Sequence, residues 1–85
     1  MYTVYILYSP KIDRFYIGSA EDMSNRLSHH NCGATPFTKR GAPEWKIVYL
    51  EPADSKSEAR KRELQIKRMK SRKYLLKLID QSQIQ

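Results

Sequence analysis

The sequence predicts an α/β protein of the α+β kind, with a small three-stranded antiparallel sheet flanked by helices in the order β-β-α-β-α-α. Three observations lead to this prediction. Two aromatic, strand-like segments stand close together near the start. The pattern then changes from alternating to helical periodicity. Serines precede the helical segments at positions typical of N-caps. A chain of 85 residues has the length of one domain, so we expect a single domain over residues 1–85.

The strands are expected near residues 2–8, 14–19 and 45–51. The first, YTVYILY, is apolar or aromatic on both of its faces, which is typical of a central strand. The turn SPKIDR makes the second strand, RFYIG, its hairpin partner. The third strand, WKIVYLE, follows a loop rich in glycine and proline over residues 33–44 with room for one short turn.

The helices are expected near residues 20–31, 56–70 and 72–80. Ser19 is predicted to cap the first helix, and Gly33 follows its end. Ser55 and Glu58 form a capping box at the start of the second helix. Ser71 is predicted to cap the third.

Composition narrows the class of protein. A single cysteine rules out an internal disulfide, and His29, His30 and Cys32 lack the spacing of a structural zinc site. The sequence has no apolar run of the roughly 20 residues that a membrane span needs. It also lacks the pattern of a signal peptide. We therefore expect a soluble, cytoplasmic protein without a membrane partner.

The positive charge is concentrated in one region. The net charge is +7, yet residues 56–77 contain ten basic and two acidic residues, a net +8, which leaves −1 for the rest of the chain. A solvated helix face would explain many lysines, but the asymmetry favours a nucleic-acid-binding surface. Lys67, Arg68 and Lys70 are the residues expected to contact phosphates.

Two predicted helices carry polar residues where apolar ones are expected. Leu27 and His30 share a stripe of the first helix, and Arg26 flanks it. A core histidine and an arginine with a buried stem would explain these residues without a function. In the next helix Glu63 points inward with Ala59, Ile66 and Met69. An inward carboxylate needs a partner. Two partners fit equally well. One is a cation, either Arg26 or a nearby lysine, and the other is a metal ion.

Tyr5 and Tyr16 occupy the middle of adjacent strands, where a core would accept phenylalanine. Together with Arg26, His30 and Glu63 they are expected to converge on one face of the sheet. Phosphodiester hydrolysis uses such a set. An arginine matches phosphate oxygens, a metal-bound carboxylate neutralises charge, and a phenol with a lowered pKa helps to deprotonate water.

These residues resemble the GIY-YIG nuclease family over nearly the whole chain, and its small, single-domain members most of all. The first half-motif aligns with Thr3-Val4-Tyr5, where Thr-Val replaces Gly-Ile, and the second with Tyr16-Ile17-Gly18. The helix arginine of the family aligns with Arg26 in NRL, a histidine with His30 in HHN, and its metal-binding glutamate with Glu63 in RKRELQIK.

The resemblance implies a metal-dependent endonuclease with one divalent cation, Mg²⁺ or Mn²⁺, held by Glu63. It implies that Tyr5 helps to deprotonate the attacking water, that Tyr16 supports it, and that Arg26 stabilises charge in the transition state. His30 is a further catalytic candidate. Lys39 and Arg40, in the loop TKRG, are candidates for phosphate contacts.

The expected substrate is nucleic acid, with DNA favoured, in a process such as repair or recombination. The alternative is a noncatalytic nucleic-acid-binding protein that retains the fold. A purely structural module would leave the charge asymmetry and the inward Glu63 without a purpose.

Overall fold

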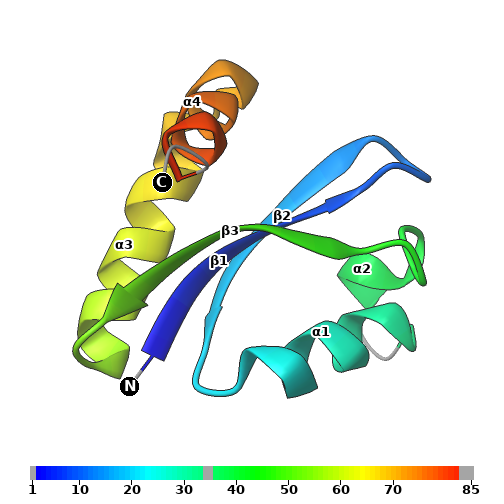
Figure 1. Cartoon of the computed structure of the whole chain (residues 1–85), viewed down its shortest axis with the longest axis horizontal. Coiled ribbons are helices and arrows are strands. Elements are labelled where there is room, and N and C mark those ends of the chain that lie inside the picture. Colours follow the sequence, from blue (N-terminus) through cyan, green and yellow to red (C-terminus); the bar gives the residue numbers. More distant parts are fainter. Residues whose placement is uncertain (1, 34–35, 83–85) are drawn as a thin grey trace.

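The strands form one antiparallel sheet with the aromatic N-terminal strand at its centre (Figure 1). The computed structural model describes residues 2–33 and 36–82. The strands are β1 (Tyr2–Ser9), β2 (Arg14–Ala20) and β3 (Lys46–Ala53). Both β2 and β3 pair with β1 in antiparallel register, so the sheet order is β2-β1-β3. The predicted sheet and its central strand are confirmed.

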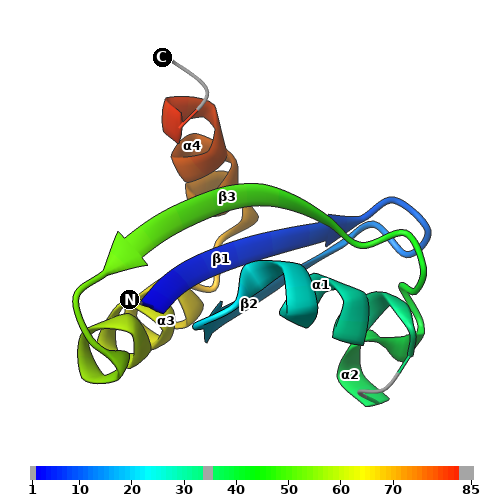
Figure 2. The same cartoon turned by 60° about the horizontal axis from the view of Figure 1, so that its bottom comes forward.

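Helices cover both faces of this sheet. They are α1 (Met23–Asn31), the short α2 (Pro36–Lys39), α3 (Lys56–Met69) and α4 (Arg72–Ser82). Successive strand side chains point to opposite faces. Tyr5 packs in a cluster with Leu27 of α1, whereas its neighbour Val4 packs with Ile66 of α3. In Figure 2, α1 and α2 lie below the strands and α4 lies above them.

The first helix begins three residues later than predicted, and its cap is a different residue. Asp22 is the N-cap, and its side chain accepts a hydrogen bond from the backbone N–H of Asn25. The prediction of Ser19 as the cap is wrong because β2 continues to Ala20, which pairs with Thr3 of β1. Gly33 follows the helix with a φ of +76°, as a residue after a helix end often does.

The other two predicted caps are confirmed. Ser55 accepts a hydrogen bond from the N–H of Glu58, and Ser71 accepts one from the N–H of Tyr74. Lys70 adopts a left-handed φ of 46° between α3 and α4. Met69, predicted to face inward, is 48% exposed because α3 ends there and the chain turns away. None of the helices in the described ranges has the length and hydropathy to cross a membrane.

Candidate active site

A cleft of about 430 Å³ opens beside the edge strand β2, between α1 and α3. Four of the five predicted catalytic residues line it: Tyr5, Tyr16, Arg26 and Glu63. The strands and α1 supply three of them, and α3, which packs on the opposite face of the sheet, supplies Glu63. The expectation that all five share one sheet face is therefore wrong. They meet around the edge of the sheet, because β2 has no further strand beyond it.

Tyr5 reaches the cleft because the residue opposite it is a glycine. Tyr5 pairs with Gly18 across β1 and β2, and its side chain is 2% exposed. A Cβ atom added to Gly18 would lie 2.5 Å from the Tyr5 hydroxyl and 2.7 Å from its ring. No real side chain tolerates such distances, so the missing Cβ creates the space in which the phenol lies.

The Tyr5 hydroxyl contacts a buried histidine. Its oxygen lies 3.1 Å from Nε2 of His30, and Nδ1 of the same ring lies 2.9 Å from Oγ1 of Thr38. His30 and Thr38 are both buried. Burial lowers the pKa of His30, and the charges of Arg26 and His29 lower it further. The imidazole is therefore neutral at pH 7, behind Tyr5 as seen from the cleft.

Burial acts on Tyr5 in the opposite direction. It raises the pKa of the phenol, and Tyr16 and Glu63 raise it further, whereas Arg26 counteracts the rise. The expectation of a phenol with a lowered pKa is wrong for Tyr5 in this structure. Tyr5 is a neutral phenol at pH 7 that can accept one hydrogen bond while donating another.

Tyr16 completes an aromatic group with these two residues. It lies on the same sheet face as Tyr5, diagonally across the strand pair, because its partner on β1 is Leu7. Its ring centroid is 4.8 Å from that of His30 and 6.3 Å from that of Tyr5. Tyr16 is half-buried and lines the cleft, so one part of its ring supports His30 and another faces the cleft.

Glu63 uses both of its carboxylate oxygens. Ser19 donates a hydrogen bond to Oε1 at 2.8 Å, and Lys67 donates one to Oε2 at 2.7 Å. The Glu63 side chain is 12% exposed and that of Lys67 is 45% exposed. Of the two interpretations of an inward glutamate, the pair with a nearby lysine is thus present. Arg26, the other proposed partner, is exposed on α1 at the cleft wall.

The donor set of the cleft suits a hard divalent ion with few protein ligands. The described residues contain no group of three or more His, Cys, Asp or Glu side chains placed to hold a metal ion. The cleft has the two carboxylates Glu21 and Glu63 in its lining. Mg²⁺ is commonly bound by one or two carboxylates, with water and substrate phosphates as the other ligands. Glu63 fits that role, provided that Lys67 moves away.

The predicted nucleic-acid-binding residues fall into separate places on an exposed surface. Lys67 and Lys70 line a groove next to the cleft, formed by the β1–β2 turn and the α3–α4 junction. Arg40 lines another hollow, together with Tyr16, which points to the face of β2 opposite to that of Ile17 in the groove. Lys39 and Arg68 are exposed at the surface. The basic residues of α3 and of the TKRG loop thus lie on both sides of the edge strand.

Three residues of the site were not predicted to take part in it: Gly18, named only as the end of the second half-motif, Ser19, predicted as a helix cap, and Thr38. The register of the hairpin, with Gly18 opposite Tyr5, indicates the first. Ser19 follows Gly18, so alternation places it on the α3 face and in reach of Glu63. Thr38 lies on α2, and no pattern in the sequence links it to His30.

Comparison with known proteins places the chain in a family. A family model for the GIY-YIG catalytic domain matches residues 1–75, and the chain belongs to that family. Members of this family are nucleases, so the fold and the cleft define a nuclease-type domain. The predicted resemblance to the GIY-YIG family is confirmed.

Similar proteins carry the name UPF0213. The chain is 45% identical to one from Staphylococcus saprophyticus over 67 residues, 78% of this chain and 79% of the relative. It is 44% identical to one from Syntrophus aciditrophicus over 69 residues, 79% and 77% of the two chains. It is 36% identical to one from Clostridium perfringens over 81 residues, 95% and 85%. No solved structure matches the chain.

Proposed function

We propose that this protein is a divalent-metal-dependent nuclease that hydrolyses phosphodiester bonds in nucleic acid, with DNA as the favoured substrate. The observation that carries the proposal is the meeting of Tyr5, Tyr16, Arg26 and Glu63 in one cleft at a sheet edge. Four elements supply these side chains. A role in stability alone would not require a phenol, a cation and a carboxylate to face the same opening.

In the proposed reaction, Tyr5 and His30 together accept the proton of the attacking water. The raised pKa of Tyr5 means that the phenol takes up a proton only as it gives one away. With its own proton on Nδ1, neutral His30 accepts the Tyr5 proton at Nε2, 3.1 Å away. The water oxygen forms the new bond to phosphorus while the bond from phosphorus to the leaving sugar oxygen breaks, and that oxygen takes a proton from solvent in the cleft. The imidazolium later returns its Nε2 proton to solvent in the cleft through the Tyr5 hydroxyl.

The remaining residues stabilise charge on the phosphate. Arg26 lines the cleft and supplies a guanidinium for the non-bridging oxygens. Tyr16 holds the imidazole in place through ring contact. Glu63 would hold Mg²⁺ or Mn²⁺, with Ser19 orienting the carboxylate. When bound, this ion supplies positive charge for the oxygen that leaves phosphorus.

The test is cleavage of single-stranded, duplex, flapped and branched DNA and RNA in Mg²⁺, Mn²⁺ or EDTA. We expect the protein to cut at least one substrate in the metal ions but not in EDTA. Glu63→Gln should abolish cleavage yet lower stability by only about 0.5–1 kcal/mol, because its partner Lys67 is half exposed. Glu44→Gln removes an exposed carboxylate outside the cleft and should retain cleavage. Cleavage by Glu63→Gln at the wild-type rate would contradict the proposed site.

A second candidate is a noncatalytic nucleic-acid-binding protein. It is favoured by the engagement of both Glu63 oxygens with Ser19 and Lys67, which leaves the carboxylate satisfied without a metal. Both candidates predict binding that weakens steeply as salt is raised, because Lys67, Arg68 and Lys70 would contact phosphates. Only the nuclease predicts metal-dependent products, so salt-sensitive binding without cleavage of any substrate would support the second candidate.

A further inference from the structure

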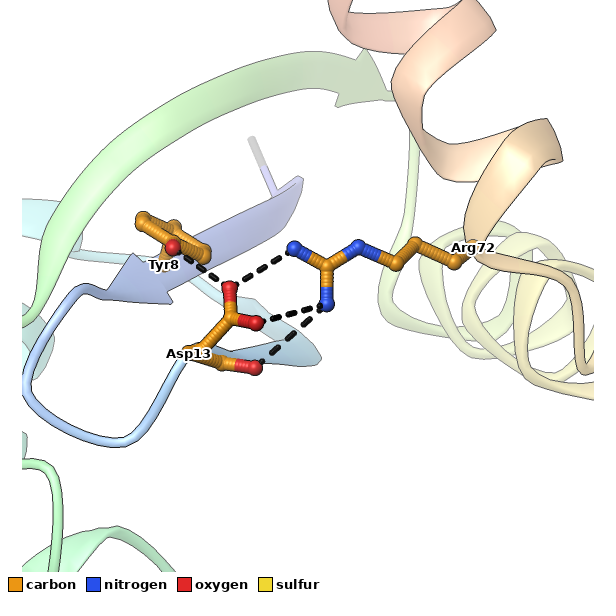
Figure 3. Close-up of polar contacts among 3 residues, drawn as sticks. All are labelled: Tyr8, Asp13 and Arg72. Carbon is orange, nitrogen blue, oxygen red and sulfur yellow. Dashed lines mark hydrogen bonds and ion pairs between the residues drawn. The ribbon is translucent and has the colours of Figure 1, made fainter.

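A groove of about 250 Å³ is linked to the cleft by a contact between Lys67, which lines the groove, and Glu63, which lines the cleft. The lining of the groove includes the basic residues Arg14, Lys67, Lys70 and Arg72 and one acid, Asp13. Figure 3 shows the Arg72 guanidinium reaching from α4 to the Asp13 carboxylate, with N–O distances of 2.7 and 3.3 Å. In this pair the positive charge of Arg72 and the negative charge of Asp13 neutralise each other. Within the described ranges, no ion pair joins Arg14 or Lys70 to an acid, so the groove retains positive charge.

Lys67 connects this groove with the active cleft. Its side chain lines the groove, while its Nζ donates to Oε2 of Glu63, which lines the cleft. The two residues are one helical turn apart on α3. The Lys67 side chain is 45% exposed, so little packing opposes a change of its rotamer. The Lys67 ammonium can therefore bind either Glu63 or a phosphate in the groove, but its interaction with one weakens its interaction with the other.

A metal ion at Glu63 and the ammonium of Lys67 exclude each other. Oε2 now accepts a hydrogen bond from the Lys67 ammonium at 2.7 Å. A cation bound to the same oxygen would lie so close to that ammonium that the two positive charges would repel each other. Ser19 presents no such conflict. Its neutral hydroxyl donates to Oε1, and the same hydrogen bond can persist when Oε2 binds a cation.

We infer that Lys67 couples the binding of nucleic acid to the binding of metal. Without nucleic acid, Lys67 occupies Glu63. A backbone phosphate in the groove between Arg14 and Lys70 draws Lys67 away and frees Glu63 for the metal ion. This inference rests on the proposed function. Because coupling between two ligands is reciprocal, the metal also strengthens binding of the nucleic acid by the same factor.

The first experiment measures Mn²⁺ affinity in the absence of nucleic acid, by calorimetry, for the full chain. Lys67→Met should bind Mn²⁺ about three- to tenfold more tightly than the wild type, because the competing ammonium is gone. Arg60→Met is the matched control, since Arg60 also lines the cleft but makes no ion pair with Glu63. It should change the affinity less than twofold.

The second experiment measures the affinity for a short oligodeoxynucleotide in EDTA and in Ca²⁺, with the DNA shown to remain intact at the end. In the wild type and in Arg60→Met, Ca²⁺ should strengthen binding by a larger factor than in Lys67→Met. Lys67→Met loses the coupling because Glu63 is already free. A direct contact between metal and phosphate would strengthen binding in every variant. The ratio of the Ca²⁺ effect in the wild type to that in Lys67→Met therefore reports the contribution of Lys67 alone.

The outcomes separate the inference from the proposed function. Equal Mn²⁺ affinity of the wild type and Lys67→Met would overturn the coupling and leave the metal site intact. An equal increase in Mn²⁺ affinity in Lys67→Met and Arg60→Met would also overturn the coupling. The loss of any positive charge near the cleft would then explain the tighter binding. If no variant binds Mn²⁺ while Glu63→Gln retains cleavage, the proposed site itself is wrong.

Discussion

The two faces of the sheet bury different kinds of side chain, although one strand serves both. On the α1–α2 face, β1 contributes Tyr5, whose hydroxyl contacts the buried polar residue His30, which in turn contacts the buried Thr38. On the α3–α4 face it contributes Val4 to a cluster with Ala59 and Ile66. The residues proposed for proton transfer, Tyr5 and His30, thus lie on the polar face. The aliphatic face holds the helix that carries Glu63 to the sheet edge.

The difference has energetic consequences. In the described part of the chain, every buried side-chain nitrogen and oxygen has a hydrogen-bond partner. A polar core of this kind is sensitive to the loss of a single atom, because the remaining group loses its partner. An aliphatic core responds instead to lost volume. A substitution on one face can therefore be compared with a substitution on the other as its reference.

The largest effect is expected from Tyr5→Phe on the polar face. The ring remains, so only the hydroxyl that contacts His30 is lost. We expect the cleavage rate to fall about 10²–10⁴-fold, the usual contribution of general acid–base catalysis. Unfolding free energy should fall by only about 0.5–1.5 kcal/mol, one hydrogen bond. Tyr8→Phe, on the same strand, should retain the rate. A wild-type rate in Tyr5→Phe would remove Tyr5 from the mechanism.

On the aliphatic face, Ile66→Ala should change stability and leave the chemistry of the folded protein intact. Ile66 is 1% exposed, and its truncation should cost about 2–5 kcal/mol, measured by urea denaturation. Leu64→Ala, two residues earlier on α3 at 43% exposure, should cost far less. An equal loss in both variants would show that the aliphatic face is not packed as described.

The sequence predicts the aliphatic face well because periodicity alone defines it. Ala59 and Ile66 lie on the predicted stripe and are buried. The same periodicity predicted Met69 to face inward. Periodicity does not show where a helix ceases to pack on the sheet, and Met69 lies at the end of α3. The elements themselves begin and end within three residues of their predicted places.

The polar face was predicted only in part, because its contacts join residues without a common period. Tyr5, Tyr16 and His30 stood out as polar groups in apolar positions. Ser19 was predicted to be a helix cap, since serine before a helical segment usually caps it. Its contact with Glu63, 44 residues away along the chain, follows from tertiary structure alone.

A smaller effect concerns the pH dependence of stability, which should arise from His30. Its pKa in the folded state is lowered, chiefly by burial, so protonation favours the unfolded chain. The stabilisation is complete above the unfolded pKa of about 6.5 and is lost as the pH falls through the folded value. The melting temperature of the wild type should therefore drop between pH 7 and pH 5 by more than that of His30→Gln.

The control for this pH effect is His29→Gln, because His29 is exposed and adjacent. The drop in melting temperature should be as large in this variant as in the wild type. If His29→Gln and His30→Gln flatten the pH profile equally, the buried imidazole is not its source.

The smallest effect is expected from Arg72→Gln, which acts on neither buried face. Arg72 pairs with Asp13 (Figure 3). Its guanidinium carbon also lies 5.2 Å from the centroid of the Phe15 ring, so Arg72 ties α4 to the hairpin. Both partners are exposed, and exposed pairs contribute little and are screened by salt. The melting temperature should fall slightly in low salt, and the difference from the wild type should shrink in 1 M NaCl. Lys73→Gln, next along α4, removes an equal charge without an ion pair in the described structure and should show a still smaller change. A drop in Arg72→Gln that persists in 1 M NaCl would mean that packing on Phe15, rather than charge, holds α4 to the hairpin.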